Sequence, residues 1–170
     1  MLLKTIGAIC VIGVCSGVGL NLAYRHMKEI GTLQKLLVVL DFMENELRFR
    51  LTKLPKLCMM AAEECEGVLR KVFLQIYQEL QTQTIPDVKI CVFTAIAKVD
   101  RIPTATKHVF YRLGTTLGRF DLVGQLKGFE AVKGFCQLQL EELNRDSKNR
   151  IRGYQTLGLC TGAALAILLI

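Results

Sequence analysis

Two long uncharged segments at the ends of the chain constrain its fold more than any other feature. Residues 5–24 contain no charged side chain, and residues 153–170 contain none either. About 20 consecutive apolar residues are enough to cross a bilayer as a helix. We therefore predict transmembrane helices at residues 1–24 and 153–170, with a single domain, residues 25–152, between them.

A cleaved signal peptide is the main alternative for the first segment, because Lys4 followed by an apolar run resembles the start of one. No convincing cleavage site precedes Tyr24, and Arg25, His26 and Lys28 follow it closely. We therefore expect the first span to be retained.

The positive charges predict the orientation of the chain. Of the 22 lysines and arginines, all but Lys4 lie between Arg25 and Arg152. Because positively charged flanks stay on the cytoplasmic side, the sequence predicts a two-pass cell-membrane protein with a cytoplasmic central domain. The cations are scattered among acids and form no stripe interleaved with aromatic residues, which disfavours nucleic-acid binding.

Between the two predicted spans, apolar residues recur at every third or fourth position, and no convincing strand is present. Pro55 is expected to begin the second helix, Gly67 to end it and Pro86 to open the fourth. Pro103, with Thr104 as the cap, is expected to begin the fifth. The predicted fold class is all-α: a cytoplasmic bundle of about six helices between an N-terminal and a C-terminal transmembrane helix.

The spacing also predicts which residues face the core. Glu44 interrupts the face of the first helix, and nothing breaks the sixth helix between Leu122 and Ile170, a rod of about 70 Å. The core positions predicted are Ile30, Leu33, Leu37, Leu40, Leu47, Val72, Phe73, Ile76, Leu80, Val88, Val92, Ala95, Ile96, Val99, Val109, Phe110, Leu113, Leu122, Leu126, Phe129, Val132, Cys136, Leu140 and Leu143.

The sequence lacks the residue patterns of catalysis and of metal binding. It has no phosphate-binding loop, dinucleotide fingerprint, HExxH motif or nucleophile elbow. Its seven cysteines form no CxxC pair, and its two histidines are His26 and His108. We expect the cysteines to be small buried hydrophobes, with no catalytic, cofactor-binding or metal site.

The acidic residues receive a similar interpretation. Side chains that are adjacent on a helix diverge by about 100°, so Glu63-Glu64 and Glu141-Glu142 cannot act jointly on one bond. They are expected to lie on solvated faces, and Glu44 and Glu46 are expected to do the same. The chain is therefore not expected to be an enzyme.

Small residues recur at a spacing of four in both predicted spans. Such rows let membrane helices approach closely, either within one chain or between copies, so the spacing leaves a homo-oligomer open. The predicted packing positions are Gly13, Gly17, Gly158 and Gly162.

A double Leu-Gly segment separates the fifth helix from the sixth. Its glycines suit a helix C-cap and a tight corner, and Asp121 suits the cap of the sixth helix. A corner of this kind can also present a surface for a partner. The predicted partner interface is Leu113, Gly114, Leu117, Gly118, Phe120, Asp121 and Gln125; the second candidate is the exposed side of the second helix around Lys56, Glu63 and Glu64.

Several short motifs follow one another along the chain. They are Glu46-Leu47, Thr52-Lys53-Leu54-Pro55, the double Leu-Gly corner, and Tyr154-Gln155-Thr156-Leu157-Gly158 leading to Gly162 and an apolar ending. Over the whole length this order resembles the stage III sporulation protein AB family of endospore-forming bacteria. The chain departs from the family pattern at Lys53 and Phe120, where proline and serine are expected, and residues 82–101 match only in helical character.

The resemblance implies a membrane component of the sporulation channel complex, in the mother-cell membrane around the forespore. It implies a cytoplasmic domain similar to the secretion F domains of type II secretion. The implied partners are stage III sporulation protein AA, a cytoplasmic ATPase of the same operon, and other membrane components of the complex. No cofactor is implied.

Other classes stay open on the sequence alone. An unrelated two-span membrane adaptor or scaffold would share the topology. A pore subunit is disfavoured because Lys4 is the sole charged residue in either span, and an enzyme is disfavoured by the lack of catalytic motifs.

Overall fold

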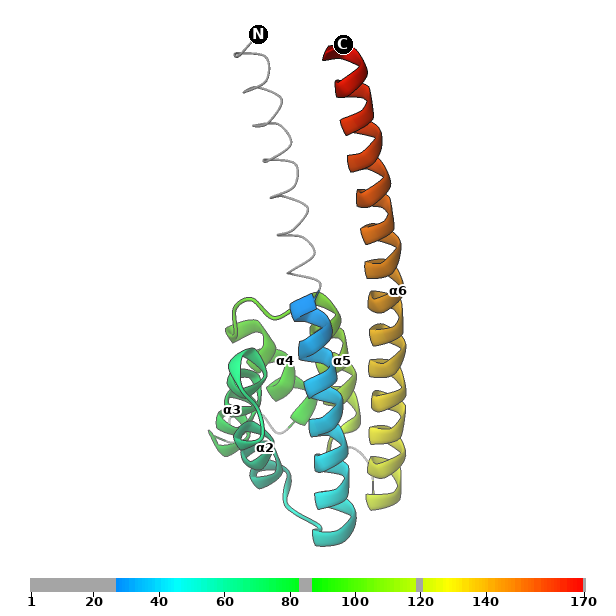
Figure 1. The fold of residues 1–170 in the computed structure, drawn as a ribbon. Helices are drawn as coiled ribbons and strands as arrows, with labels where there is room; N and C mark the ends of the chain where they lie inside the picture. The colour runs from blue at the N-terminus through cyan, green and yellow to red at the C-terminus, as the bar shows by residue number, and fades with distance from the viewer. Residues whose placement is uncertain (1–26, 83–86, 119–120, 170) are drawn as a thin grey trace. The chain divides into compact units, whose positions relative to one another are not determined.

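The computed structural model describes residues 27–82, 87–118 and 121–169, with side chains up to Asp146 (Figure 1). This described part contains six helices and no strand, which confirms the all-α fold class. The chain divides into two compact units: one is Gly31–Leu140, and the other comprises Met1–Ile30 and Glu141–Ile170. The first unit holds the helical domain and its core.

The helices follow one another with short connections. Residues 27–50 form the first described helix, called helix 27–50 below. The others are α2 (Leu54–Glu63), α3 (Gly67–Thr82), α4 (Val88–Lys98), α5 (Thr104–Thr116) and α6 (Leu122–Leu169). As predicted, α6 is one uninterrupted helix of 48 residues, which contains Gly153 without a break.

The predicted membrane spans are not established by the structure. No helix among the described residues is both long and apolar enough to cross a bilayer. The first predicted span, residues 1–24 with Gly13 and Gly17, lies outside the described residues. Of residues 153–170, the structure gives a helical backbone as far as residue 169. The side chains of this segment are not described, so the predicted packing at Gly158 and Gly162 stays a prediction.

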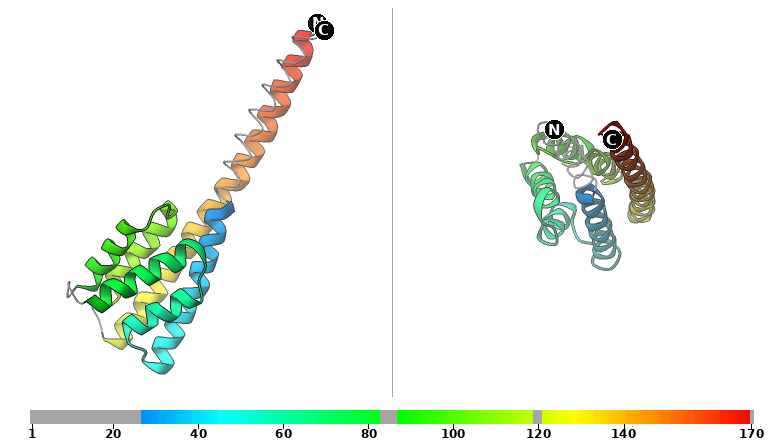
Figure 2. Two further views of the ribbon diagram at one scale, coloured as in Figure 1. Left: turned by 90° about the vertical axis from the view of Figure 1, so that its left-hand side faces the viewer. Right: turned by 45° about the horizontal axis from the view of Figure 1, so that its top comes forward.

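Consecutive helices pack on one another within the domain, α2 on α3, α3 on α4, and α4 on α5 (Figure 2). Three phenylalanines from different helices, Phe73, Phe110 and Phe129, are fully buried at the centre. The rings of Phe73 and Phe110 meet edge to face, with centroids 5.2 Å apart. Burying a phenylalanine side chain contributes about 1.5–3 kcal/mol of hydrophobic stabilisation.

Most predicted core positions are confirmed on α3, α4, α5 and the first part of α6. Leu122 is exposed instead, because it stands at the start of α6. On helix 27–50 the buried face is wider than predicted, since this helix contacts α6 and also approaches the α2–α3 connection. Its additional buried residues are Leu36, Val39 and Met43.

Two predicted helix boundaries are wrong. Helix α2 already ends at Glu63, and Gly67, with φ +63°, is the first residue of α3 rather than the end of α2. Thr104 is the first residue of α5, and Pro103 occupies the cap position without a side-chain hydrogen bond. Pro55 stands in the first turn of α2 as predicted. The fourth helix begins at Val88, with Asp87 as its cap: the Asp87 carboxylate accepts a hydrogen bond from the Lys89 N–H at 2.9 Å.

Helices α4 and α5 approach closely at Gly114. A Cβ atom at this position would lie 2.9 Å from both Cβ and Cγ1 of Val92, closer than packed carbon atoms tolerate. By contrast, a Cβ atom on Gly134 of α6 would meet nothing within 4 Å. The two helical glycines therefore have opposite structural roles.

Replacing Gly114 with alanine is expected to destabilise the domain by about 1–3 kcal/mol, because the new methyl group forces α4 and α5 apart. Gly134→Ala is expected to stabilise it by about 0.5–1 kcal/mol through helix propensity alone. Urea unfolding followed by circular dichroism measures both changes. Equal effects of the two substitutions would contradict the close approach at Val92.

Four cysteines in the described residues, Cys58, Cys65, Cys91 and Cys136, are buried and free, as predicted. Burial raises the pKa of the Cys58 thiol to about 12 and that of Cys136 to about 11. Burial, with the nearby Glu64 charge, raises the pKa of Cys65 to about 11. These thiols therefore stay protonated, and unreactive as nucleophiles, at neutral pH.

The thiols predict that the domain loses stability in alkali. The folded-state pKa values lie above the ordinary value of 9.0, so the unfolded chain releases protons that the folded chain retains. The contribution of these thiols to stability is therefore expected to be constant below about pH 9 and to fall between about pH 9 and pH 12. Melting temperatures measured across this range test the prediction, and Cys58→Ala should flatten the decline. An identical decline in that variant would assign it to other groups.

Candidate functional site: the corner end of the helical domain

The double Leu-Gly segment forms the corner between α5 and α6. At the end of α5, the Leu117 N–H donates to the Leu113 carbonyl at 3.0 Å, and Gly118 follows with φ +75°. At the start of α6, the Asp121 carboxylate accepts a hydrogen bond from the Gly124 N–H at 3.0 Å. The predicted corner at Gly118 and cap at Asp121 are confirmed, whereas Gly114 lies inside α5 and is not a C-cap.

The predicted interface residues divide into two groups. Leu113, Gly114 and Leu117 are buried within the domain, where they shape the corner. Gly118 and Asp121 are exposed, Gln125 is half-buried, and Phe120 lies outside the described residues. Docking at this corner stays a prediction, and only its exposed members can contact a partner directly.

Two glycines at the corner are required by packing. A Cβ atom on Gly118 would lie 2.6 Å from Cγ2 of Val88, and its positive φ independently favours glycine. A Cβ atom on Gly128 would overlap the Thr116 side chain, so the first turns of α6 lie directly against the end of α5. Gly128 was not predicted as a site residue, because a lone glycine in a helical pattern has no distinctive signal.

Large apolar side chains are exposed at the same end of the domain. Phe49 is 79% exposed and Leu51 is 64% exposed, at the end of helix 27–50. Leu122 and Val123, in the first turn of α6, are also exposed. We call these four residues the end patch. None of the four was predicted as a site residue, although Phe49 and Leu51 lie off the predicted inward face of the first helix.

Side-chain pairs between helix 27–50 and α6 show why the patch residues share one end. Lys133 pairs with Asp41, whereas Arg48, farther along helix 27–50, approaches Glu130, which is earlier on α6. The two helices therefore run antiparallel. The end of helix 27–50 and the start of α6 lie at one end of the domain in both views (Figures 1 and 2).

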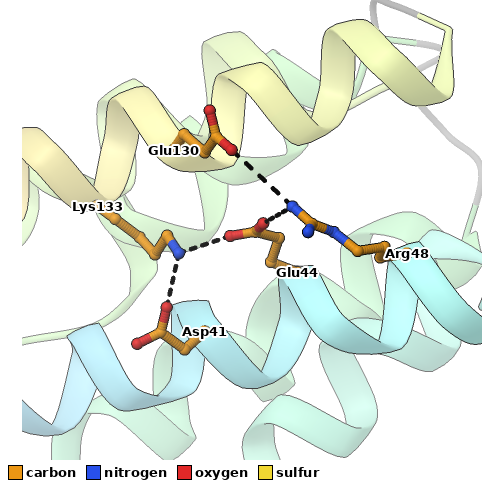
Figure 3. A network of polar contacts seen from close by, with 5 residues as sticks. All are labelled: Asp41, Glu44, Arg48, Glu130 and Lys133. Carbon is orange, nitrogen blue, oxygen red and sulfur yellow. Dashed lines mark hydrogen bonds and ion pairs between the residues drawn. The ribbon is translucent and has the colours of Figure 1, made fainter.

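Glu44 is the centre of a charged network between these two helices (Figure 3). Its Oε1 accepts a hydrogen bond from Arg48 Nη2 at 2.6 Å, and its Oε2 lies 2.6 Å from Lys133 Nζ. Lys133 Nζ also donates to Asp41 Oδ1 at 2.7 Å, and Arg48 Nη2 lies 3.9 Å from Glu130 Oε1. Hydrogen bonds to Asp41 and then to Glu44 raise the pKa of Lys133.

The expectation that Glu44 is solvated is wrong: the residue is 5% exposed. Glu46 is also largely covered, because its side chain is 12% exposed and pairs with Arg50 at 3.2 Å. Helical spacing had placed Glu44 on the inward face, and the partner that makes its burial tolerable, Lys133, is distant in sequence. The glutamates at 63, 64, 141 and 142 are exposed as predicted.

Lys133→Met is expected to destabilise the domain by about 2 kcal/mol, because Glu44 then keeps a buried carboxylate oxygen without its cation. The matched control is Lys35→Met. Lys35 pairs with Glu66 at 3.8 Å between two well-exposed side chains, and its loss should cost less than about 0.5 kcal/mol. Urea unfolding measures both, and a Lys133 effect no larger than the control would contradict a structural role for the network.

The second predicted surface, on the second helix, is exposed to solvent. Lys56 and Glu63 of α2, and Glu64 directly after it, are exposed, as that alternative requires. His108 is exposed on α5. Within the described residues, no group of three or more His, Cys, Asp or Glu side chains is placed to hold a metal ion.

The structure defines a class of protein with an all-helical domain whose last helix continues as a long C-terminal helix. Ion pairs join the first described helix to this last one. The family model of stage III sporulation protein AB matches residues 4–170. The chain therefore belongs to the stage III sporulation protein AB family, and it has a role in sporulation. This membership excludes the unrelated membrane adaptor.

A solved structure of a stage III sporulation protein AB has a similar fold. The match covers 71% of this chain and 97% of that chain, with a TM-score of 0.60 and 15% sequence identity. At this identity the likeness shows the fold alone. No curated protein matches the chain.

Proposed function

We propose that the protein is a non-enzymatic membrane component of the stage III sporulation channel complex. Its two terminal segments anchor it in the mother-cell membrane around the forespore, with the helical domain in the cytoplasm. The domain docks the secretion-type ATPase, stage III sporulation protein AA, and passes force or position from this motor to the membrane components.

The single observation that carries the proposal is the course of α6. This helix begins at the corner end of the domain, contributes Phe129, Val132 and Cys136 to the core, and continues to Leu169. An uninterrupted helix is stiff, because every interior backbone group is hydrogen-bonded within it. A displacement of the domain could therefore be transmitted to the C-terminal segment through one continuous helix.

Two further observations support a binding role. The uncharged segments at residues 5–24 and 153–170 suit a bilayer, and the basic residues that flank them suit a cytoplasmic domain. The sequence contains no nucleotide-binding or catalytic motif. The energy for transport would then have to come from a separate protein, and an ATPase would supply it.

Co-purification of the full chain, in detergent, with the operon's ATPase tests the proposal. We expect a stoichiometric complex with a Kd of about 1 µM or tighter, as for a specific interface of ordinary size. The control is a chain carrying Gly114→Val, whose close contact with Val92 should unfold the domain and abolish binding. Failure of the folded chain to bind the ATPase would contradict docking.

Gly118 is a poor position for a surface probe, because any side chain there collides with Val88 and strains the backbone. Loss of binding in a Gly118 variant would report misfolding of the corner. Probes of docking must instead use the exposed residues at this end.

A further inference from the structure

Leu51 adopts a backbone conformation that its own side chain disfavours. Its φ is +51°, and its N–H donates to the Leu47 carbonyl at 3.3 Å, which closes helix 27–50. Glycine or asparagine usually fills such a left-handed position after a helix, because a Cβ atom is crowded there. Glycine at this position would therefore strain the backbone less than leucine does.

The Leu51 side chain gains little from folding in return, because it is 64% exposed. Phe49, two residues earlier, is 79% exposed. Leu122 and Val123 add apolar surface at the same end. The end patch therefore contains residues from the first described helix and from the last one. Several large apolar side chains exposed together are typical of an interaction site.

The charges around the end patch are mainly positive. Lys53, Lys56 and Lys127 are exposed and have no ion pair within the described part of the chain. Arg50 is also exposed, although it pairs with the mostly covered Glu46. The exposed acids near this end are Asp121, whose carboxylate accepts from the Gly124 N–H, and Glu130, which lies 3.9 Å from Arg48. A surface of this kind is complementary to an acidic partner that inserts apolar side chains.

We propose that the end patch and its lysines are the docking surface for the ATPase, which contributes an acidic segment with apolar anchors. This inference rests on the proposed function and adds to it the site and the chemistry of the partner. An anionic bilayer would offer similar chemistry. The patch, however, lies about 30 Å along helix 27–50 from the end that follows the predicted span, which favours a protein partner.

Leu51 allows binding to be separated from folding. Leu51→Gly removes the exposed side chain and relieves the backbone, so the melting temperature should be unchanged or raised. ATPase affinity of the full chain in nanodiscs should nevertheless fall roughly tenfold or more, and Phe49→Ala should have a similar effect. The matched control is Leu138→Ala: Leu138 is 63% exposed on α6, away from the patch, and its loss should change affinity by less than about twofold.

The lysines give a second readout. Affinity of the wild-type chain should weaken as salt is raised, and replacing Lys53, Lys56 and Lys127 with glutamine should remove most of this dependence. Both results together support an acidic partner surface.

The remaining outcomes have distinct meanings. If the wild-type chain does not bind the ATPase, the proposed function and this inference fail together. If it binds and Leu51→Gly and Phe49→Ala bind equally well, docking stands and the end patch is overturned as its site. If those variants lose binding to vesicles rich in anionic lipid but retain the ATPase, the patch is a lipid-binding surface and the proposal is overturned.

Discussion

The buried carboxylate of Glu44 is the contact on which the arrangement of the domain depends. It lies between Arg48 of its own helix and Lys133 of α6, and so joins the first described helix to the last one. Apolar faces alone permit helices to slide by a turn, whereas such a slide would leave Glu44 buried without its cation. The network therefore fixes the register of two helices that are distant in sequence.

That register determines the surface at the corner end. Because helix 27–50 and α6 run antiparallel, the residues that end one helix lie beside the residues that begin the other. Phe49 and Leu51, at the end of helix 27–50, are therefore at the same end of the domain as Leu122 and Val123, in the first turn of α6. A surface made from two separate segments exists only when the domain is folded. Such a surface suits a domain that binds another protein.

The corner that carries much of the family resemblance has mainly a structural role in this chain. Leu113 and Leu117 are buried, Gly114 admits Val92 and Gly118 turns the chain. A motif can therefore identify the family because it specifies the fold, while the residues that meet a partner lie around it. Family membership and the similar fold of a solved relative agree with this interpretation.

The helical class, the family and most of the core were predictable from the amino-acid sequence, because a helix fixes which residues share a face and short motifs specify the corner. The sequence also indicated the cap at Asp121 and the uninterrupted course of α6. The burial of Glu44, and the position of Phe49 and Leu51 at the same end of the domain as the start of α6, were established by the tertiary structure. Those outcomes depend on contacts between residues far apart along the chain, such as Glu44 with Lys133, which local spacing does not encode.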